Sequence, residues 1–405
     1  MIQIFNKTHS KISTVMAVFN AGSRVESKGK FNAGISHMLE HSIFKGTDKR
    51  SASQIMEDVS LMGGYINAFT SHEMVAYYLQ LPYDNLEEGI ELLSDIVLNS
   101  NVPDEEFLKE KEVVKQEESS SCDDVESYMY RQFAKNFYTN YLRNPIIGTQ
   151  ESIDRFTSDE VRDFYKMHCS KDKVVVAVSS NCTKKDATAL MKKYFGKANG
   201  RVKKKLGYKN SNYKSLGETL ELTRPSIEHT YVWLCFPGLL KSSKITPHLH
   251  VLERIIGGGM DSRLFREVRE KRGLVYSIYA TSVSFDTAGA FKICFSCKDE
   301  NVNEVIGLIK KEIDLIQKNP LEKNELIKVK NVKRTAYYHQ LEDGMSMSMS
   351  KIQNKVFDRL SVDEYEKILQ ETTEDDVISC AKNIFSNKPF TVICRGESAK
   401  DDDCE

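Results

Sequence analysis

The segment from Asn32 to Thr47, NAGISHMLEHSIFKGT, contains two histidines four residues apart. Four apolar residues recur in it at the spacing of one face of an α-helix: Ile35, Met38, Leu39 and Ile43. We therefore predict a helix over residues 33–44. Because residues four apart share one helix face, the imidazoles of His37 and His41 can bind the same metal ion.

Glu40 stands one residue before the second histidine, where its carboxylate can reach a water molecule at the metal without binding the metal itself. Two imidazoles and one carboxylate form the ligand set of many catalytic zinc sites, in which the fourth position stays open to water. A histidine pair of this spacing can also be an ordinary surface or core pair. The metal hypothesis therefore requires an Asp or Glu ligand from another element.

A glutamate-rich segment beginning at Pro103, PDEEFLKEKEVVKQEESSS, is predicted to supply that ligand. Pro103 and Asp104 are typical of the start of a helix. Glu110 and Glu117 are two helical turns apart and so point in the same direction. Either could be the ligand from its position alone, although glutamate-rich helices are more often simply solvated surfaces.

Composition excludes several classes of protein. Lys plus Arg (57) nearly balances Asp plus Glu (58), whereas a nucleic-acid-binding protein would normally have a basic excess. No apolar run approaches the roughly 20 residues of a membrane span. The first residues lack the pattern of a secretory signal or a transit peptide. Nine cysteines are scattered mostly singly, which favours reduced thiols over a disulfide framework. We therefore expect a cytoplasmic protein.

The chain is long enough for two domains. A segment without apolar periodicity, residues 199–215, is interpreted as a linker between an N-terminal zinc-binding domain (residues 1–198) and a C-terminal domain (residues 216–397). The acidic tail, residues 398–405, is expected to be disordered.

Both halves have the same order of predicted elements: a strand, a helix, further strands, long charged helices and a closing strand. The predicted strands are residues 13–22, 74–81 and 173–181, then 230–238, 289–297 and 389–396. The predicted helices are residues 33–44 and 105–138, then 247–256, 302–317 and 322–340. This order predicts the α+β class, with two similar sandwich-like halves in which helices flank an antiparallel-rich sheet, and suggests a duplicated fold.

The first segment and four later ones resemble the pitrilysin family of zinc peptidases, which carry an inverted HxxEH motif. Within that family the chain is similar to the mitochondrial and bacterial processing peptidases. The later segments are GGYINAFTSHEMVAYY, EKEVVKQEE, NPIIGTQESI and GGGMDSRLFREVREKRGLVYSIYA. They occur in the family's order and spacing, and the resemblance extends from about Val15 to Thr391.

The resemblance assigns roles to the residues of the first half. It implies that His37, His41 and Glu117 bind Zn²⁺ and that Glu40 is the general base. Glu110 then matches a supporting acidic residue that orients a ligand from outside the metal's own shell.

The resemblance also implies a substrate site. The strand Asn67, Ala68, Phe69 and Thr70 matches the edge strand to which peptide adds by main-chain hydrogen bonds. Arg269 and Tyr276 match a pair that reaches the catalytic chamber and stabilises the oxyanion. Without the resemblance, this second segment would be interpreted as a charged amphipathic helix that runs into a strand.

The resemblance therefore implies a zinc metalloendopeptidase that acts on short or unfolded polypeptides. It also implies a homodimer, because relatives of this size carry only two of the four domains that enclose a chamber. The alternative is a catalytically silent subunit of a processing complex, a class of relatives whose zinc motifs are typically broken. Neither a nucleic-acid partner nor a membrane is expected.

Overall fold

The computed structural model describes residues 1–28, 30–198, 211–225 and 227–396. The predicted linker falls largely on residues 199–210, and the predicted acidic tail falls on residues 398–405. Both of these stretches lie outside the described residues. Among the described helices, none combines the length and apolarity that a membrane span requires.

The chain forms two compact units, which are assembled from several segments. The first takes in the described residues of Met1–Arg131, Tyr141–Gly207 and Tyr338–Arg359, and the second takes in those of Gln132–Asn140, Tyr208–Tyr337 and Leu360–Glu405. The predicted domains divide the sequence at one place. In the structure, by contrast, residues 132–140 and 338–359 each pack with the opposite half of the sequence.

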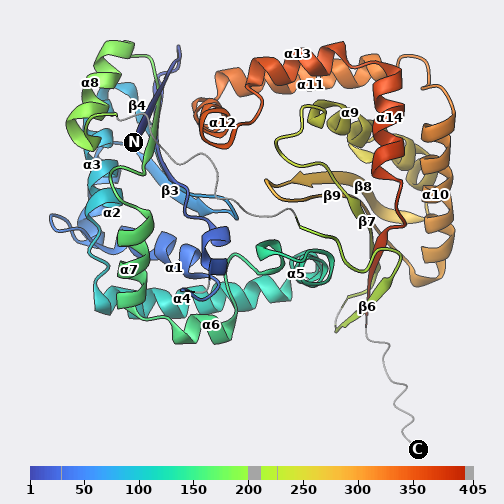
Figure 1. Ribbon diagram of the computed structural model, residues 1–405, viewed down its shortest axis with the longest axis horizontal. Coiled ribbons are helices and arrows are strands. Elements are labelled where there is room, and N and C mark those ends of the chain that lie inside the picture. Colours follow the sequence, from blue (N-terminus) through green and yellow to red (C-terminus); the bar gives the residue numbers. More distant parts are fainter. Residues whose placement is uncertain (29, 199–210, 226, 397–405) are drawn as a thin grey trace, which may run out of the picture. The chain divides into compact units, whose positions relative to one another are not determined.

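The first unit is built on a sheet whose strands β3 and β4 are labelled in Figure 1. The sheet has five strands in the order β1-β5-β2-β4-β3. Its strands are β1 (Ile2–Lys7), β2 (Ile12–Phe19), β3 (Tyr65–Thr70), β4 (Val75–Pro82) and β5 (Val175–Ser180). Its helices are α1 (Ile35–Ser42), α2 (Ala52–Leu61), α3 (Leu86–Asn99), α4 (Asp104–Asp123), α6 (Gln150–Arg155), α7 (Ser158–His168), α8 (Lys184–Phe195) and α12 (Gly344–Phe357). Helix α5 (Val125–Phe137) begins in this unit and ends in the second.

Both faces of the first sheet are buried. Side chains alternate along a strand, so Val15 and Ala17 of β2 face the core beneath α1 and α3. Met16 and Val18 face the opposite way, into a second core completed by α12. This arrangement explains why residues 15–19 of β2 are an uninterrupted apolar run, since a strand that is covered on both sides needs no polar face.

The second unit repeats this plan. Its strands are β6 (Thr219–Arg224), β7 (Thr230–Pro237), β8 (Val275–Ser284), β9 (Gly289–Cys297) and β10 (Phe390–Gly396), in the order β6-β10-β7-β9-β8. Its helices are α9 (Thr246–Gly257), α10 (Val302–Lys318), α11 (Glu325–Glu342), α13 (Val362–Glu371) and α14 (Glu374–Ile384), and α11 continues into the first unit. On one face of this sheet, Phe133 of α5 packs edge-on against Trp233 of β7.

The two sheets have the same topology. In each, the first and last strands of the unit are parallel and every other neighbouring pair is antiparallel. The predicted class, α+β with two similar halves around antiparallel-rich sheets, is therefore confirmed, and so is the duplication.

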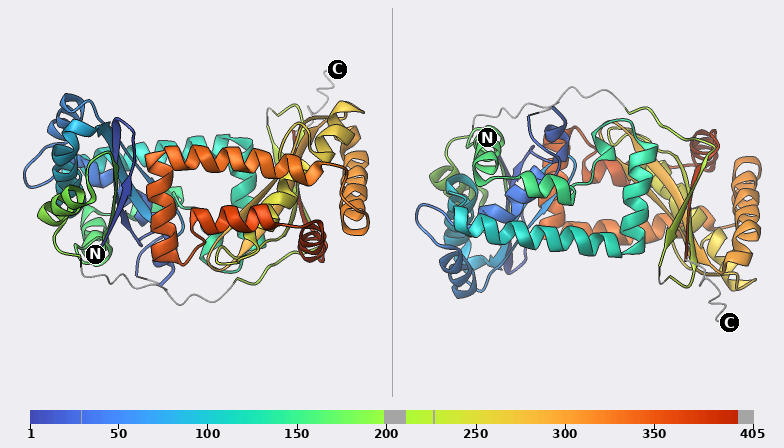
Figure 2. Two further views of the ribbon diagram at one scale, coloured as in Figure 1. Left: turned by 90° about the horizontal axis from the view of Figure 1, so that it is seen from above. Right: turned by 90° about the horizontal axis from the view of Figure 1, so that it is seen from below.

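Some predicted boundaries were wrong. The helix predicted over residues 105–138 is two helices, because Asp124 adopts an extended conformation between α4 and α5 and the chain turns a corner there (Figure 2). The polar run SSSCDD gives that point little packing to hold a helix straight. β1 was missed altogether because its partner, β5, lies more than 160 residues away in the sequence.

Candidate metal centre

Helix α1 turns its apolar face to the sheet and its polar face outward. Ile35, Met38 and Leu39 are fully buried in the core of the first unit. With 3.6 residues per turn, that packing leaves His37 and His41 together on the other side, toward α4. The predicted helix is therefore present, although it ends at Ser42 in a short 3₁₀ turn.

The start of α1 is fixed by residues outside the helix. Gly34 has a φ of 98° and lies so close to the Ile147 carbonyl that a Cβ atom would come within 2.6 Å of that oxygen, so only glycine fits there. The buried Glu26 carboxylate accepts hydrogen bonds from the backbone N–H groups of Gly34 (3.0 Å) and Ser36 (2.9 Å). Glu26 thus caps a helix whose own N-cap residue has no side chain.

Three side chains converge above the polar face of α1: His37, His41 and Glu117. One potential ligand atom from each lies within 4.8 Å of the other two. The Glu117 carboxylate lies 3.3 Å from Nε2 of His41 and 3.7 Å from Nε2 of His37. Donors bound at about 2.0–2.1 Å to a tetrahedral zinc ion lie about 3.3 Å apart, so this spacing suits zinc.

The charge states of these groups also suit a cation. Burial lowers the pKa of His37 to about 4, so this imidazole is neutral and offers a lone pair. The hydrogen bond to His41 lowers the pKa of Glu117, which keeps that carboxylate ionised. Burial lowers the pKa of His41, but hydrogen bonds to Glu117 and Glu110 outweigh burial and shift the pKa upward. The site therefore favours positive charge between His41 and Glu117, and a bound metal ion would supply it.

Glu110 lies on the far side of His41 from Glu117. Its Oε2 is 3.1 Å from Nδ1 of His41, and its Oε1 forms an ion pair with Lys45 at 2.5 Å. A carboxylate at Nδ1 accepts the proton of that nitrogen and so leaves the lone pair of Nε2 for a metal. Position in the sequence left Glu110 and Glu117 as equal candidates. In the structure Glu117 belongs to the cluster with both histidines, and Glu110 contacts Nδ1 of His41.

Glu40 lies on the same helix face and bonds to the neighbouring strand. Thr70 Oγ1 donates a hydrogen bond of 2.5 Å to Glu40 Oε2. Burial raises the pKa of Glu40, while the Thr70 hydrogen bond opposes that shift. One carboxylate oxygen is thus anchored, and the carboxylate is held beside the histidines without joining the three-residue cluster.

β3 is the edge strand next to this centre. Among the described strands it pairs with β4 only, so the main chain of Asn67, Ala68 and Phe69 has one side without a strand partner. Ile66 and Ala68 point toward the core beneath α1. A pocket of about 250 Å³ opens between α1 and β3. It is lined by Glu40, His41, Phe44, Lys45, Met56, Ile66, Asn67, Ala68 and Glu110.

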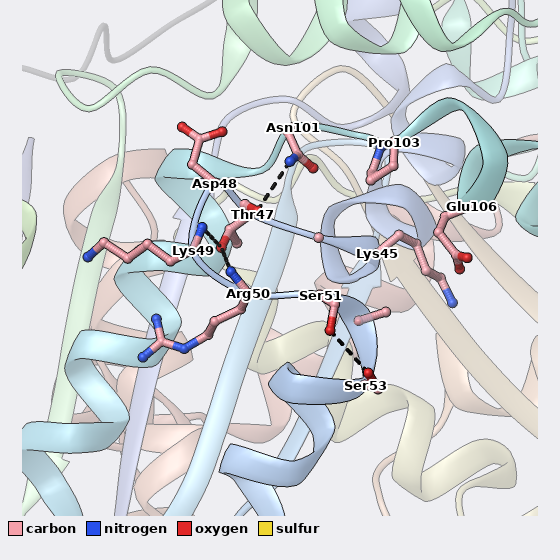
Figure 3. Close-up of a pocket in the computed structure, with 12 residues that line it drawn as sticks. Lys45, Thr47, Asp48, Lys49, Arg50, Ser51, Ser53, Asn101, Pro103 and Glu106 are labelled. Atoms are coloured by element: carbon pink, nitrogen blue, oxygen red, sulfur yellow. Dashed lines mark hydrogen bonds between the residues drawn. The ribbon is translucent and has the colours of Figure 1, made fainter.

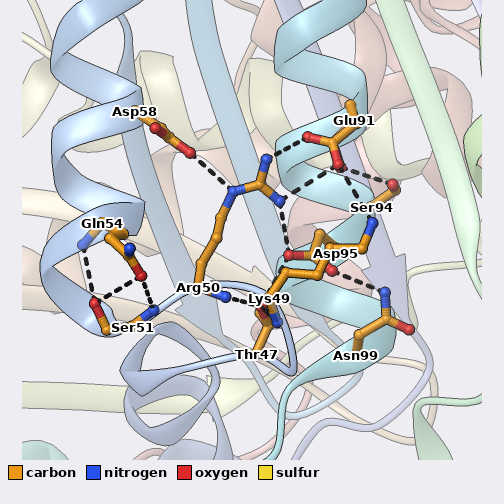
Figure 4. Close-up of polar contacts among 10 residues, drawn as sticks. All are labelled: Thr47, Lys49, Arg50, Ser51, Gln54, Asp58, Glu91, Ser94, Asp95 and Asn99. Atoms are coloured by element: carbon orange, nitrogen blue, oxygen red, sulfur yellow. Dashed lines mark hydrogen bonds and ion pairs between the residues drawn. The ribbon is translucent and has the colours of Figure 1, made fainter.

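The loop that leaves α1, residues 45–51, is held rigidly. The Arg50 guanidinium bonds to three carboxylates from α2 and α3: Asp58 (2.8 Å), Glu91 (2.7 Å) and Asp95 (2.8 Å) (Figure 4). Thr47 Oγ1 donates to Asp95 and accepts from the backbone of Lys49 and Arg50. The loop also lines a pocket of about 620 Å³ (Figure 3). The positively charged side chains that line this pocket already form ion pairs with carboxylates. We therefore assign this pocket a structural role in holding the end of α1.

Arg269 and Tyr276 lie together in the second unit. Arg269 belongs to a π-helical turn, Phe265–Glu270, and Tyr276 to the start of β8. The Arg269 guanidinium carbon is 6.0 Å from the centre of the Tyr276 ring. Both side chains are exposed, and Tyr276 is 72% exposed. A guanidinium and a phenol are thus presented side by side to solvent.

Sequence analysis missed three residues that shape the centre: Glu26, Lys45 and the hydroxyl of Thr70 as the partner of Glu40. Lys45 could have been found, since it lies four residues after His41 and follows it on the same helical face. Glu26 and the Thr70–Glu40 bond depend on how distant segments pack, and no local pattern marks them.

Both halves of the chain match known protein families. Residues 2–150 match the family described as insulinase (peptidase family M16), and residues 155–333 match the one described as the peptidase M16 inactive domain. An uncharacterized zinc protease of Streptomyces coelicolor is 29% identical over 394 residues, which cover 94% of this chain and 85% of the relative. An uncharacterized zinc protease of Mycobacterium leprae is 31% identical over 330 residues, which cover 80% of this chain and 73% of the relative.

Solved structures share the fold over nearly the whole chain. A protease from Helicobacter pylori has a TM-score of 0.87 at 20% identity, with coverage of 97% of this chain and 96% of that one. A peptidase M16 inactive domain from Pseudomonas fluorescens has a TM-score of 0.83 at 17% identity, with coverage of 98% of this chain and 96% of that one. Because both halves match M16 domains in order, and a relative at 31% identity is covered over 73% of its length, the chain belongs to peptidase family M16, the insulinase or pitrilysin family.

Proposed function

We propose that this protein is a zinc-dependent metalloendopeptidase that hydrolyses peptide bonds in short or unfolded polypeptides. The observation that carries the proposal is the convergence of His37, His41 and Glu117 next to an anchored Glu40. Three ligands with an open fourth position are typical of catalytic zinc sites, whereas structural sites are usually closed by four protein ligands. The intact cluster argues against the alternative, a catalytically silent subunit.

In this proposal His37, His41 and Glu117 hold the zinc ion, and Glu110 fixes the orientation of His41. Zinc bound there would polarise the scissile carbonyl and lower the pKa of water to about 7. Glu40 would accept the proton of the attacking water and pass it to the leaving amine. Its hydrogen bond from Thr70 engages one carboxylate oxygen and leaves the other to carry the proton.

Arg269 and Tyr276 are proposed to bind the substrate carbonyl and to stabilise the negative charge that develops on its oxygen. These roles are supported by the observation that a guanidinium and a phenol lie next to each other and are both exposed. Donors of this kind hold an oxyanion where it forms and require no reorganisation during the reaction.

The substrate is proposed to add to β3 as an extended strand along Asn67, Ala68, Phe69 and Thr70. An open strand edge next to Glu40 supports this mode, because main-chain pairing requires a segment free of its own secondary structure. The apolar part of the adjoining pocket, Phe44, Met56 and Ile66, suits a hydrophobic side chain of the peptide. A role as a processing peptidase is part of the same proposal.

Cleavage should depend on both zinc and substrate unfolding. A folded globular protein and its own unfolded fragments would be incubated with the purified chain, with and without a chelator, and products would be identified by mass spectrometry. We expect the fragments to be cleaved at least about tenfold faster, because only an extended segment can pair with β3. Chelation should stop cleavage. Equal rates for the folded and unfolded forms would contradict strand addition, and cleavage that survives chelation would contradict the zinc mechanism.

The working unit is proposed to be a homodimer in the cytoplasm. Two-fold pairing of identical chains is the commonest soluble assembly. This one chain carries both the proposed zinc site and the proposed Arg269 and Tyr276 pair, so a different partner chain is not needed to supply either of them. None of the eight cysteines in the described part of the chain forms a disulfide, in keeping with a reducing compartment. Light scattering at micromolar concentration should give about twice the mass of one 46.2 kDa chain. A fully active species of 46.2 kDa would refute the dimer.

A further inference from the structure

Residues that follow α12 return to the loop beside the proposed active site. Asp358 adopts a left-handed conformation, with a φ of 56°, and ends the helix. The next residue, Arg359, is buried, and its carbonyl accepts a hydrogen bond of 2.6 Å from the Asn354 side chain. The chain is thus turned so that the Arg359 guanidinium points into the first unit.

Arg359 forms a buried ion pair with Glu73. The guanidinium donates to the Glu73 carboxylate, and the two residues are 7% and 3% exposed. The Phe357 ring lies 5.1 Å from the Arg359 guanidinium carbon, and Arg24 contacts the same ring at 5.5 Å. Pairs of this kind are strong and directional because water does not compete for them.

Glu73 belongs to the turn that ends the edge strand. Thr70 pairs with Val75 as the last register pair of β3 and β4, so residues 71–74 form the whole connection between the strands. The Ser71 and His72 carbonyls accept hydrogen bonds from the backbone of Ser23 (3.1 Å) and Arg24 (3.0 Å). The turn is therefore held from two sides, by residues 23–24 and by Arg359.

We propose that Arg359 is a positioning residue for Glu40, a role that rests on the proposed peptidase function. The ion pair fixes Glu73, Glu73 fixes the turn, and the turn places the Thr70 hydroxyl at 2.5 Å from Glu40. A residue from the C-terminal half of the sequence thereby sets the orientation of the general base in the N-terminal half.

Steady-state kinetics with a double-mutant cycle tests this link. Arg359→Met removes the charge but keeps the length of the side chain, Thr70→Val removes the hydroxyl, and Arg359→Met/Thr70→Val combines them. We expect each single variant to lower kcat by about tenfold, the smaller effect typical of groups that orient an active residue. The combined variant should be no more than about twofold slower than Thr70→Val, because both changes break one pathway. Arg359→Lys, which keeps the charge, should recover most of kcat.

A matched control separates positioning from general destabilisation. Glu325→Gln leaves the buried Arg263 of the second unit without its carboxylate, and that pair is 2.7 Å apart. It should lower the melting temperature much as Arg359→Met does, yet keep kcat within about twofold, since the Glu325 carboxylate bonds to Arg263 and to the backbone of Glu322 and to no residue of the metal centre. An Arg359→Met effect confined to KM, or one that multiplies fully with that of Thr70→Val, would overturn the proposal.

Hydrogen exchange supplies a test that does not depend on activity. Amides of residues 70–74 should exchange at least about tenfold faster in Arg359→Met than in the wild type or in Glu325→Gln, because the turn loses the ion pair between Glu73 and Arg359. Unchanged exchange would overturn the positioning role whether or not the protein cleaves peptides. If the zinc-loaded wild type cleaved no peptide while exchange rose as expected, the proposed function would fail and the anchoring of the Thr70 turn by Arg359 would stand.

Discussion

Replacing Glu40 with glutamine is expected to lower peptide hydrolysis by about 10²–10⁴-fold, the usual contribution of a general base, while zinc stays bound. Glutamine has the same shape as glutamate, and its amide oxygen can still accept the Thr70 hydrogen bond. It cannot accept a proton from water at neutral pH. Hydrolysis of a peptide and the zinc content of the same preparation are the two measurements.

The matched control for this variant is Glu88→Gln. It makes the same change on the exposed face of α3, away from the metal centre, and should leave both rate and zinc unchanged. Wild-type activity in Glu40→Gln would rule out the assigned base. Loss of zinc from Glu40→Gln would mean that the residue is a ligand instead.

Glu117→Ala and His41→Ala should each lose activity, and the zinc content of each should fall from about one ion per chain to well below one. The Glu117 carboxylate reaches the Nε2 atoms of both histidines, so its removal takes away one of the three proposed zinc ligands. Metal analysis after gel filtration, alongside peptide hydrolysis, measures both effects.

Glu110→Gln provides the graded comparison. Glu110 contacts Nδ1 of His41 and not the Nε2 side that faces Glu117, so its loss should weaken zinc affinity or activity by about 10–100-fold without abolishing either. The opposite result, in which Glu110→Ala loses all metal and Glu117→Ala keeps it, would reverse the two assignments.

Much of the fold could be predicted because its signals are local. The apolar run of β2 and the helical stripe of α1 depend on residues that are close together in the sequence, and both elements lie within about three residues of the predicted bounds. The histidine pair was visible for the same reason. The choice between Glu110 and Glu117 required the family resemblance, since helical periodicity makes the two equivalent.

The remaining features depend on contacts between distant segments. α12 has the sequence GMSMSMSKIQNKVF, whose serines and lysines mask the few apolar residues that pack on the first sheet, Ile352 and Val356 among them. The Arg359–Glu73 pair joins residues 286 positions apart. No pattern within a short window specifies such contacts, because the partner is chosen by tertiary packing.

The exchange of segments between the units also sets the order in which the chain can fold. One face of the first sheet, including Met16 and Val18, is covered by Ile352 and Val356. During synthesis this apolar face therefore has no cover until residues near 359 have left the ribosome. At about 5–20 residues per second, that wait is on the order of 10–30 s after residue 198 is made. An open apolar sheet face over such a time is a binding surface for chaperones and a point of aggregation, so the N-terminal half made alone should be poorly soluble.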